Sequence, residues 1–132
     1  MTSATSPITP ADETELDPAS RYDVRADAAR ASVLQRYAWG AFKEQHGWHV
    51  ARDAGDGFAV QILLKRKFGI TIGYVPRGPA VDWHDADAVA RCFGVLDALC
   101  KREGVALALI EPDTMLPADF DCRRYGLSPS NL

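Results

Sequence analysis

Apolar and polar residues alternate along this chain with two different periods, and the clearest period is helical. Residues 85–103 carry apolar side chains three and four positions apart, which places them on one face of a helix. Gly104 supplies the residue type that commonly ends a helix. The residues on the apolar face are Val89, Cys92, Phe93, Leu96, Leu99 and Cys100. This segment predicts a long helix that packs one face against the rest of the fold.

Between residues 48 and 75 the period shortens and turn residues interrupt it. Runs of β-branched and apolar residues cover 48–52, 58–68 and 71–75. An Asp-Ala-Gly-Asp-Gly turn separates the first two runs, and Gly69 separates the second from the third. Short connections of this kind join antiparallel neighbours, so the segment predicts a meander of three antiparallel strands.

Two further segments precede the meander. Trp39 and Phe42 lie at helical spacing, which predicts a helix over residues 36–45 that Gly47 ends. Residues 22–25 are compatible with a short strand or with a lead-in to the Ala-rich, helix-tolerant stretch that follows.

The long helix is followed by a strand and a short helix. Residues 105–110 are almost continuously apolar, as expected of a strand that is buried on both faces. Residues 119–125 predict a short helix that Gly126 caps. The order of elements indicates an α+β fold with an α/β-like, mixed sheet: an antiparallel meander with flanking helices.

Composition divides the chain into a tail and one domain. Residues 1–20 hold three prolines, four acids and no Lys or Arg, so we expect a disordered acidic tail. Residues 21–132 are expected to form a single domain. The chain has a formal net charge of −3, and because four of its acids lie in residues 1–20, the domain has a formal charge of +1. A nearly neutral domain argues against strong nonspecific binding of nucleic acid.

Features of location point to the cytoplasm. The chain has no secretory signal at its start and no run of about 18 apolar residues that could span a membrane. Of its three cysteines, Cys92 and Cys100 are roughly 12 Å apart along the expected helix, which is too far for a disulfide. Free thiols suit a reducing compartment. We therefore expect the protein to lie in the cytoplasm, a location that includes the inner face of the membrane.

Four groups of residues follow one another in an order that is more specific than any one of them. They are Val-Leu-Gln at 33–35 with Trp-Gly-Ala-Phe-Lys at 39–43 and Gly-Trp at 47–48, then Tyr-Val-Pro-Arg-Gly-Pro at 74–79, Ile-Glu-Pro-Asp at 110–113, and Tyr-Gly-Leu-Ser-Pro-Ser-Asn at 125–131. Together they resemble the N-terminal half of FemABX-type, lipid II glycyltransferase-like aminoacyltransferases, which add amino acids to the stem peptide of peptidoglycan precursors. The resemblance implies one GNAT-like unit of a two-unit enzyme, and hence a truncated subdomain.

The candidate substrate-binding residues are Lys43, Arg77, Trp39 and Glu111. Lys43, in the Trp-x-x-x-Lys segment that begins at Trp39, corresponds to a lysine that helps hold the phosphates of the precursor. Taken without the resemblance, Trp39 reads as a core residue and Lys43 as a surface residue. Arg77 lies at the tip of a turn, where it can pair with a phosphate or carboxylate, or equally form a salt bridge with Asp82.

Two acids follow the expected strand at 105–110. Glu111 and Asp113 lie at its carboxyl end, where open sheets often bind ligands, although either acid could simply cap or pair with a neighbour. In the resembled family this segment lies beside the acceptor site. Asp113 is therefore the candidate catalytic base, since an acceptor amine loses a proton as it attacks an aminoacyl ester.

The resulting hypothesis is an aminoacyltransferase of interpeptide-bridge synthesis that is weak or inactive as this fragment, so whether the chain is itself an enzyme stays open. Its partners would be a nucleotide-linked or lipid-linked muropeptide and, for a complete enzyme, aminoacyl-tRNA. No metal or organic cofactor is implied, and the pair His46 and His49 lacks further ligands. One alternative is a non-catalytic module that self-associates or docks on a second half. A small acyl-CoA transferase is disfavoured because no Gly-rich phosphate-binding turn is present.

Overall fold

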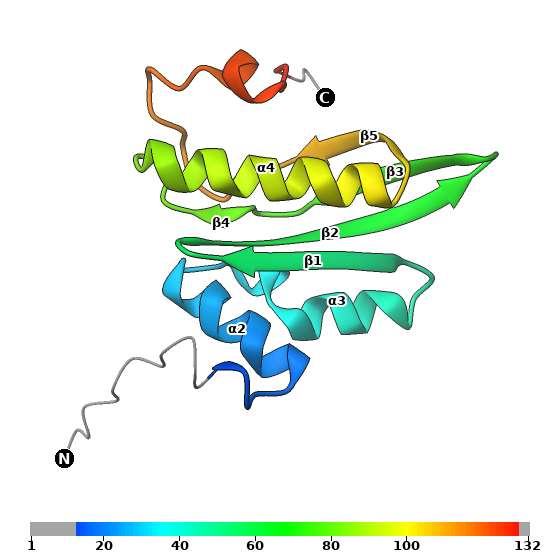
Figure 1. Cartoon of the computed structure of the whole chain (residues 1–132). Helices are drawn as coiled ribbons and strands as arrows, with labels where there is room; N and C mark the ends of the chain where they lie inside the picture. Colours follow the sequence, from blue (N-terminus) through cyan, green and yellow to red (C-terminus); the bar gives the residue numbers. More distant parts are fainter. Residues whose placement is uncertain (1–12, 130–132) are drawn as a thin grey trace.

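The computed structural model describes residues 13–129, and a five-stranded mixed sheet forms its centre (Figure 1). The strands lie in the order β1-β2-β3-β5, and the short β4 pairs with β2. Neighbours are antiparallel except β3 and β5, which are parallel. The elements are α2 (Pro18–Ala28), the 3-10 turn η1 (Val33–Gln35), α3 (Tyr37–Glu44), β1 (His49–Gly55), β2 (Phe58–Lys67), β3 (Ile70–Val75), β4 (Ala80–Val81), α4 (Ala86–Arg102), β5 (Val105–Ile110) and the 3-10 turn η2 (Cys122–Tyr125).

Strand β2 is the buried centre of the sheet, because helices cover it on both faces. Its residues Val60, Ile62 and Leu64 face α4 and join the main apolar core. Ala59 lies next to Val60 and faces the opposite side of the sheet, where it packs with Tyr22 and Ala26 of α2. Helices α2 and α3 pack mainly against β1 and β2 on that second face. One part of the second face is therefore left open.

A pair of buried glutamines ties the helical segment before β1 to the sheet. The side-chain nitrogen of Gln35 donates to the backbone oxygens of Pro76 (2.8 Å) and Gln61 (3.1 Å). Its side-chain oxygen accepts from the backbone N–H of Gln61 at 2.8 Å. The side chain of Gln61 in turn donates to the backbone oxygen of Arg36, and both glutamines are fully buried. Buried polar groups that are this completely paired fix the geometry of the segments they join.

The loop after β3 packs directly on Gln35. Gly78 lies so close to it that an added Cβ would meet the Gln35 side chain at 2.5 Å. The adjacent Arg77 adopts a positive φ of 47°, in a backbone region that is unfavourable for residues other than glycine. The loop conformation therefore depends on Gln35 filling the space beneath it.

Most of the expected elements are confirmed. The three-stranded antiparallel meander is present, and the helices expected at 36–45 and 85–103 correspond to α3 and α4. Helix α4 begins after Asp85, whose side chain accepts from the N–H of Ala88 at 3.1 Å. The short helix expected at 119–125 is the 3-10 turn η2, which Gly126 caps in the left-handed conformation.

The expectations for the first part of the chain need correction. The sequence allowed either a short strand or a lead-in at residues 22–25, and these residues lie inside α2. The tail was expected to reach residue 20, yet α2 begins at Pro18, and Glu13 is buried and pairs with Arg25 at 3.1 Å. Pro18 suits the first turn of a helix, and Asp17 caps it by accepting from the N–H of Ser20. Residues 1–12 of the expected tail lie outside the described residues.

The expectation that residues 105–110 are buried on both faces is wrong. Strand β5 lies at one edge of the sheet, and α4 packs against one of its faces. Leu107 is 65% exposed and Leu109 is 39% exposed. An apolar run predicts what a strand is able to bury, and does not show that something covers it.

The three cysteines carry no disulfide within residues 13–129. Cys92, Cys100 and Cys122 are free thiols, and Cys92 is fully buried. Burial raises the pKa of the Cys92 thiol to about 12. Within residues 13–129, no helix is both long and apolar enough to cross a membrane.

The glutamine pair leads to a prediction about stability. Replacing Gln35 with Ala leaves the N–H of Gln61 and the oxygen of Pro76 buried without partners, at about 1–3 kcal/mol for each group. We expect Gln35→Ala to lower the free energy of unfolding by about 3 kcal/mol in chemical denaturation. The exposed Gln45 supplies the control, and Gln45→Ala should change it by less than about 0.5 kcal/mol. Equal effects of the two substitutions would contradict this role of Gln35.

A second prediction concerns alkaline pH. Burial raises the pKa of Tyr22 well above its ordinary value of 10.0, and its hydroxyl donates to the backbone oxygen of Gln35 at 2.7 Å. In the unfolded chain the phenol ionises near pH 10 while the folded chain keeps the proton, so the free energy of unfolding falls as pH rises past 10. Urea titrations should show the stability advantage of wild type over Tyr22→Phe shrinking above about pH 10. If the stability advantage of wild type over Tyr22→Phe stayed constant as the pH rose past 10, the prediction for Tyr22 would be wrong.

Candidate functional site

The second face of the sheet has an open part over β3 and β5, which we call the open face. Cross-strand pairing aligns Lys65 of β2 with Ile72 of β3 and Leu107 of β5 in one row. Tyr74 and Leu109 are paired in the next row. Ile72 is 47% exposed, whereas its neighbours in β3 are buried on the α4 side. The open face is therefore a shallow sheet surface with α3 at one border and the free edge of β5 at the other.

Two lysines and two tryptophans meet at the α3 border, and we call them the two-lysine cluster. The ammonium nitrogen of Lys43 lies 5.2 Å from the ring centre of Trp39 and 5.8 Å from that of Trp48. The ammonium nitrogen of Lys65 lies 4.6 Å from the same Trp48 ring. Neither lysine forms an ion pair with a residue in 13–129. Two positive charges thus lie on one indole without a carboxylate to neutralise them.

Local sequence explains why these residues meet. Trp39 and Lys43 are one helical turn apart in α3, so their side chains share a face. Gly47 adopts a φ of 88°, which turns the chain back so that the N–H of Trp48 donates to the backbone oxygen of Lys43 at 3.1 Å. The register of β1 with β2 then brings Lys65 beside Trp48.

A second group of polar residues lies at the carboxyl ends of β3 and β5. The hydroxyl of Tyr74 donates to a carboxylate oxygen of Glu111 at 3.1 Å. Partial burial, and then this hydrogen bond, raise the pKa of Tyr74 above its ordinary value. The backbone of Glu111 bonds to Val75 and Gly78, which joins the end of β5 to the loop after β3. The parallel pairing of two strand ends is what brings these residues together.

Arg77 projects from this loop, and its positive charge opposes the rise in the pKa of Tyr74. It is exposed and forms no salt bridge with Asp82, the alternative that the sequence left open. Asp82 instead accepts from the backbone N–H of His84 at 3.0 Å. Arg77 is therefore available beside Tyr74 and Glu111.

Asp113 lies beyond the end of β5 and is exposed. No hydrogen bond or ion pair holds its side chain against another residue within 13–129. The structure therefore supplies no group that orients Asp113, in contrast to Glu111.

The sequence-predicted residues thus form two groups on one face. Lys43 and Trp39 belong to the two-lysine cluster, whereas Arg77 and Glu111 lie at the strand ends. Sequence reasoning gave no role to Trp48, Lys65 or Tyr74, which complete these groups. Counting back along the hairpin from its Asp-Gly turn places Trp48 opposite Lys65, so a signal for that contact was present.

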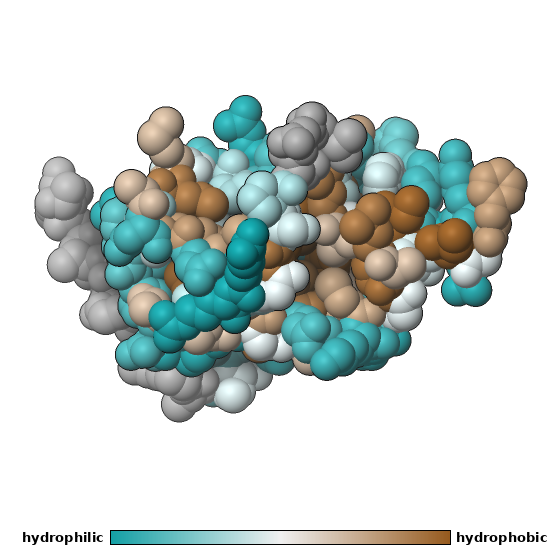
Figure 2. Space-filling model, turned by 90° about the horizontal axis from the view of Figure 1, so that it is seen from above, coloured by the Kyte–Doolittle hydropathy of each residue, from teal (hydrophilic) through white to brown (hydrophobic). Residues whose placement is uncertain are grey.

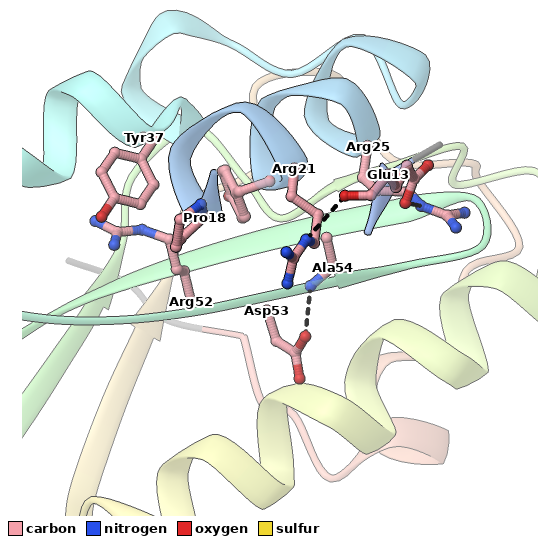
Figure 3. Close-up of a pocket in the computed structure, with 9 residues that line it drawn as sticks. Glu13, Pro18, Arg21, Arg25, Tyr37, Arg52, Asp53 and Ala54 are labelled. Carbon is pink, nitrogen blue, oxygen red and sulfur yellow. Dashed lines mark hydrogen bonds and ion pairs between the residues drawn. The ribbon is translucent and has the colours of Figure 1, made fainter. Parts of the chain in front are cut away.

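A hollow of about 350 Å³ lies elsewhere, between α2 and β1 (Figure 3). None of the sequence-predicted site residues lines it. Arg21 points into it from α2 and donates to the backbone oxygens of Glu13 and Leu16, while Arg25 pairs with Glu13. The guanidinium carbon of Arg52 lies 3.8 Å from the ring centre of Tyr37. These contacts fasten the start of α2 to the sheet, so we assign the hollow a structural role.

The open face offers charge and apolar contact rather than metal chemistry. Within residues 13–129, no group of three or more His, Cys, Asp or Glu side chains is placed to hold a metal ion. The ammonium groups of the two-lysine cluster suit phosphate, and the indole rings suit an apolar or planar group. The carboxylate of Glu111 and the guanidinium of Arg77 suit an amine and a carboxylate, respectively.

Comparison with known proteins gives a match in structure only. Neither the models of protein families nor the curated proteins yield a match to the sequence. Among solved structures, the crystal structure of FemX is similar, with a TM-score of 0.63 and 23% sequence identity. The similarity covers 70% of this chain and 26% of the FemX chain, so this chain corresponds to about a quarter of FemX. The mixed sheet with its flanking helices thus has a fold similar to part of FemX, as the sequence resemblance led us to expect.

Proposed function

We propose that the open face binds the phosphate-bearing part of a peptidoglycan precursor, as a portion of an aminoacyltransferase of interpeptide-bridge synthesis. The observation that carries this proposal is the two-lysine cluster, where two ammonium groups that have no ion pair within residues 13–129 lie near the ring of Trp48. The FemABX-like fold supports the choice of precursor as ligand. The sequence motifs around Lys43 and Arg77 support it independently.

The chemistry of the cluster favours phosphate over a single carboxylate. Lys43 and Lys65 present their charges from different elements, α3 and β2, against one ring. Two ammonium groups held apart in this way can contact separate oxygens of a diphosphate, which carries more charge than one lysine would neutralise. Trp39 and Trp48 limit the movement of Lys43, which lowers the entropy lost when the ligand binds.

The group at the strand ends is suited to the acceptor part of the precursor. We assign Arg77 to a carboxylate of the stem peptide and Glu111 to its amine. Asp113 remains the proposed general base, which would take the proton that the amine loses during attack on the aminoacyl ester. The chain spans about a quarter of FemX, so the aminoacyl-tRNA site and the rest of the precursor site belong, under this proposal, to parts that this chain does not include.

The first test is a calorimetric titration of the chain with nucleotide-linked muropeptide. Lys43→Ala should weaken binding at least about tenfold, because a phosphate loses a positioned charge partner. Lys101→Ala is the matched control, since Lys101 is an exposed lysine that pairs with Asp97 on the far side of α4 from the open face. Equal binding by wild type and Lys43→Ala, or no binding by either, would refute the assignment.

The second test separates the cluster from a single lysine. Lys65→Ala should also weaken binding, and the double variant should lose less than the sum of the two losses if both ammonium groups contact one diphosphate. Raising the salt concentration should weaken wild-type binding more than binding by the double variant. If Lys65→Ala binds as wild type does, the ligand contacts Lys43 alone.

A further inference from the structure

The free edge of β5 is unusual because nothing in its sequence protects it. Its six residues, Val105–Ile110, carry no charge and no proline, and within residues 13–129 β3 is its only neighbour in the sheet. A register shift between Thr71 and Ile72 leaves Ala106 without a partner in β3, so the regular part of the edge runs from Leu107 to Ile110. Edge strands of soluble proteins are commonly protected by charged side chains, prolines or bulges. An uncharged strand whose outer edge is unpaired is suited to pairing with another strand.

The apolar surface beside this edge continues onto β3. Ile70 is 51% exposed, Ile72 is 47% exposed, and Ile72 is the cross-strand partner of Leu107, which is 65% exposed. Figure 2 views the molecule from above Figure 1, the side on which β5 lies, and shows apolar surface gathered toward the β2–β3 hairpin. A strand added at the β5 edge would therefore extend an apolar face as well as satisfy backbone groups.

The two ends of β5 differ in charge. Its first residue closely follows Lys101, Arg102 and the partly buried Glu103 at the end of α4, and it lies near the β2–β3 hairpin, where Arg66 and Lys67 are exposed, so basic residues outnumber acids at this end. Its last residue is followed by Glu111 and Asp113, both exposed acids. An antiparallel neighbour with the same sequence would bring its acidic end to the basic end of this strand, and the reverse. A parallel neighbour with the same sequence would bring like charges together.

We propose that a second copy of this chain occupies the edge, with the two β5 strands paired antiparallel about a two-fold axis. Two such subunits form a closed dimer with a continuous sheet, in which neither copy keeps an unpaired β5 edge. Side chains that oppose each other across antiparallel strands lie on the same face. The open faces therefore align only when Leu107 of one copy lies opposite Leu107 or Leu109 of the other. This assembly goes beyond the ligand-binding role proposed above and does not depend on it.

Sedimentation of the whole chain over a wide range of concentration tests the proposal. Wild type should pass from monomer to dimer and form no larger species. Leu107→Lys should raise the dissociation constant of the dimer at least about tenfold, because the apolar contact between neighbouring side chains across the two strands is lost and two ammonium groups of like charge are brought close together. Since Leu107 is largely exposed in the single chain, its replacement should leave the circular dichroism spectrum unchanged.

Met115 supplies the control, because it is 93% exposed and lies outside β5. Met115→Lys should dimerise as wild type does. A wild-type chain that stays monomeric at every concentration overturns the proposal. A dimer that Leu107→Lys leaves intact, or that Met115→Lys weakens equally, overturns it as well, since the contact would then lie elsewhere or be nonspecific.

Discussion

Gln35, through its side-chain amide and its backbone oxygen, holds together three segments that are far apart in sequence. It bonds to the backbone of β2 at Gln61 and to Pro76 in the loop after β3, while the backbone oxygen of Gln35 accepts from Tyr22 of α2. Because these groups are buried, none of them can exchange its partner for water. The position of α3 beside β1, and hence of Lys43, follows from this connection, and so does the conformation of the loop that carries Arg77.

A consequence of that arrangement is that the two faces of the sheet are covered differently. Helix α4 covers β1, β2 and β5 on one face, whereas α2 and α3 are held over β1 and β2 on the other. The exposed part of the second face combines a charged border at α3 with an apolar border at β5. The same geometry therefore supports two separate proposals: a ligand at the charged border and a second strand at the apolar edge.

Turn chemistry and helical spacing made much of the fold predictable from sequence. The Asp-Gly turn and Gly69 set the meander, and the apolar stripe set α4. Two features were not predictable for physical reasons. Gln35 carries a polar side chain, and only the tertiary structure shows that backbone groups from distant segments surround it. Residues 105–110 were expected to be buried because a sequence shows the apolar run but not what lies against it. Lys43 and Trp39 were identified through a motif, yet their partner Lys65 depends on strand register.

The central claim is that the open face, and the two-lysine cluster in particular, holds a phosphate-bearing ligand. The three indole N–H signals of the chain offer a direct test, because Trp39 and Trp48 belong to the cluster whereas Trp83 is buried in the core on the α4 side. The measurement is a nuclear magnetic resonance titration with nucleotide-linked muropeptide that follows these three signals. The account predicts that the signals of Trp39 and Trp48 shift with added ligand while that of Trp83 stays in place. A shift of Trp83 alone, or no shift of Trp39 and Trp48 at saturating ligand, would contradict it.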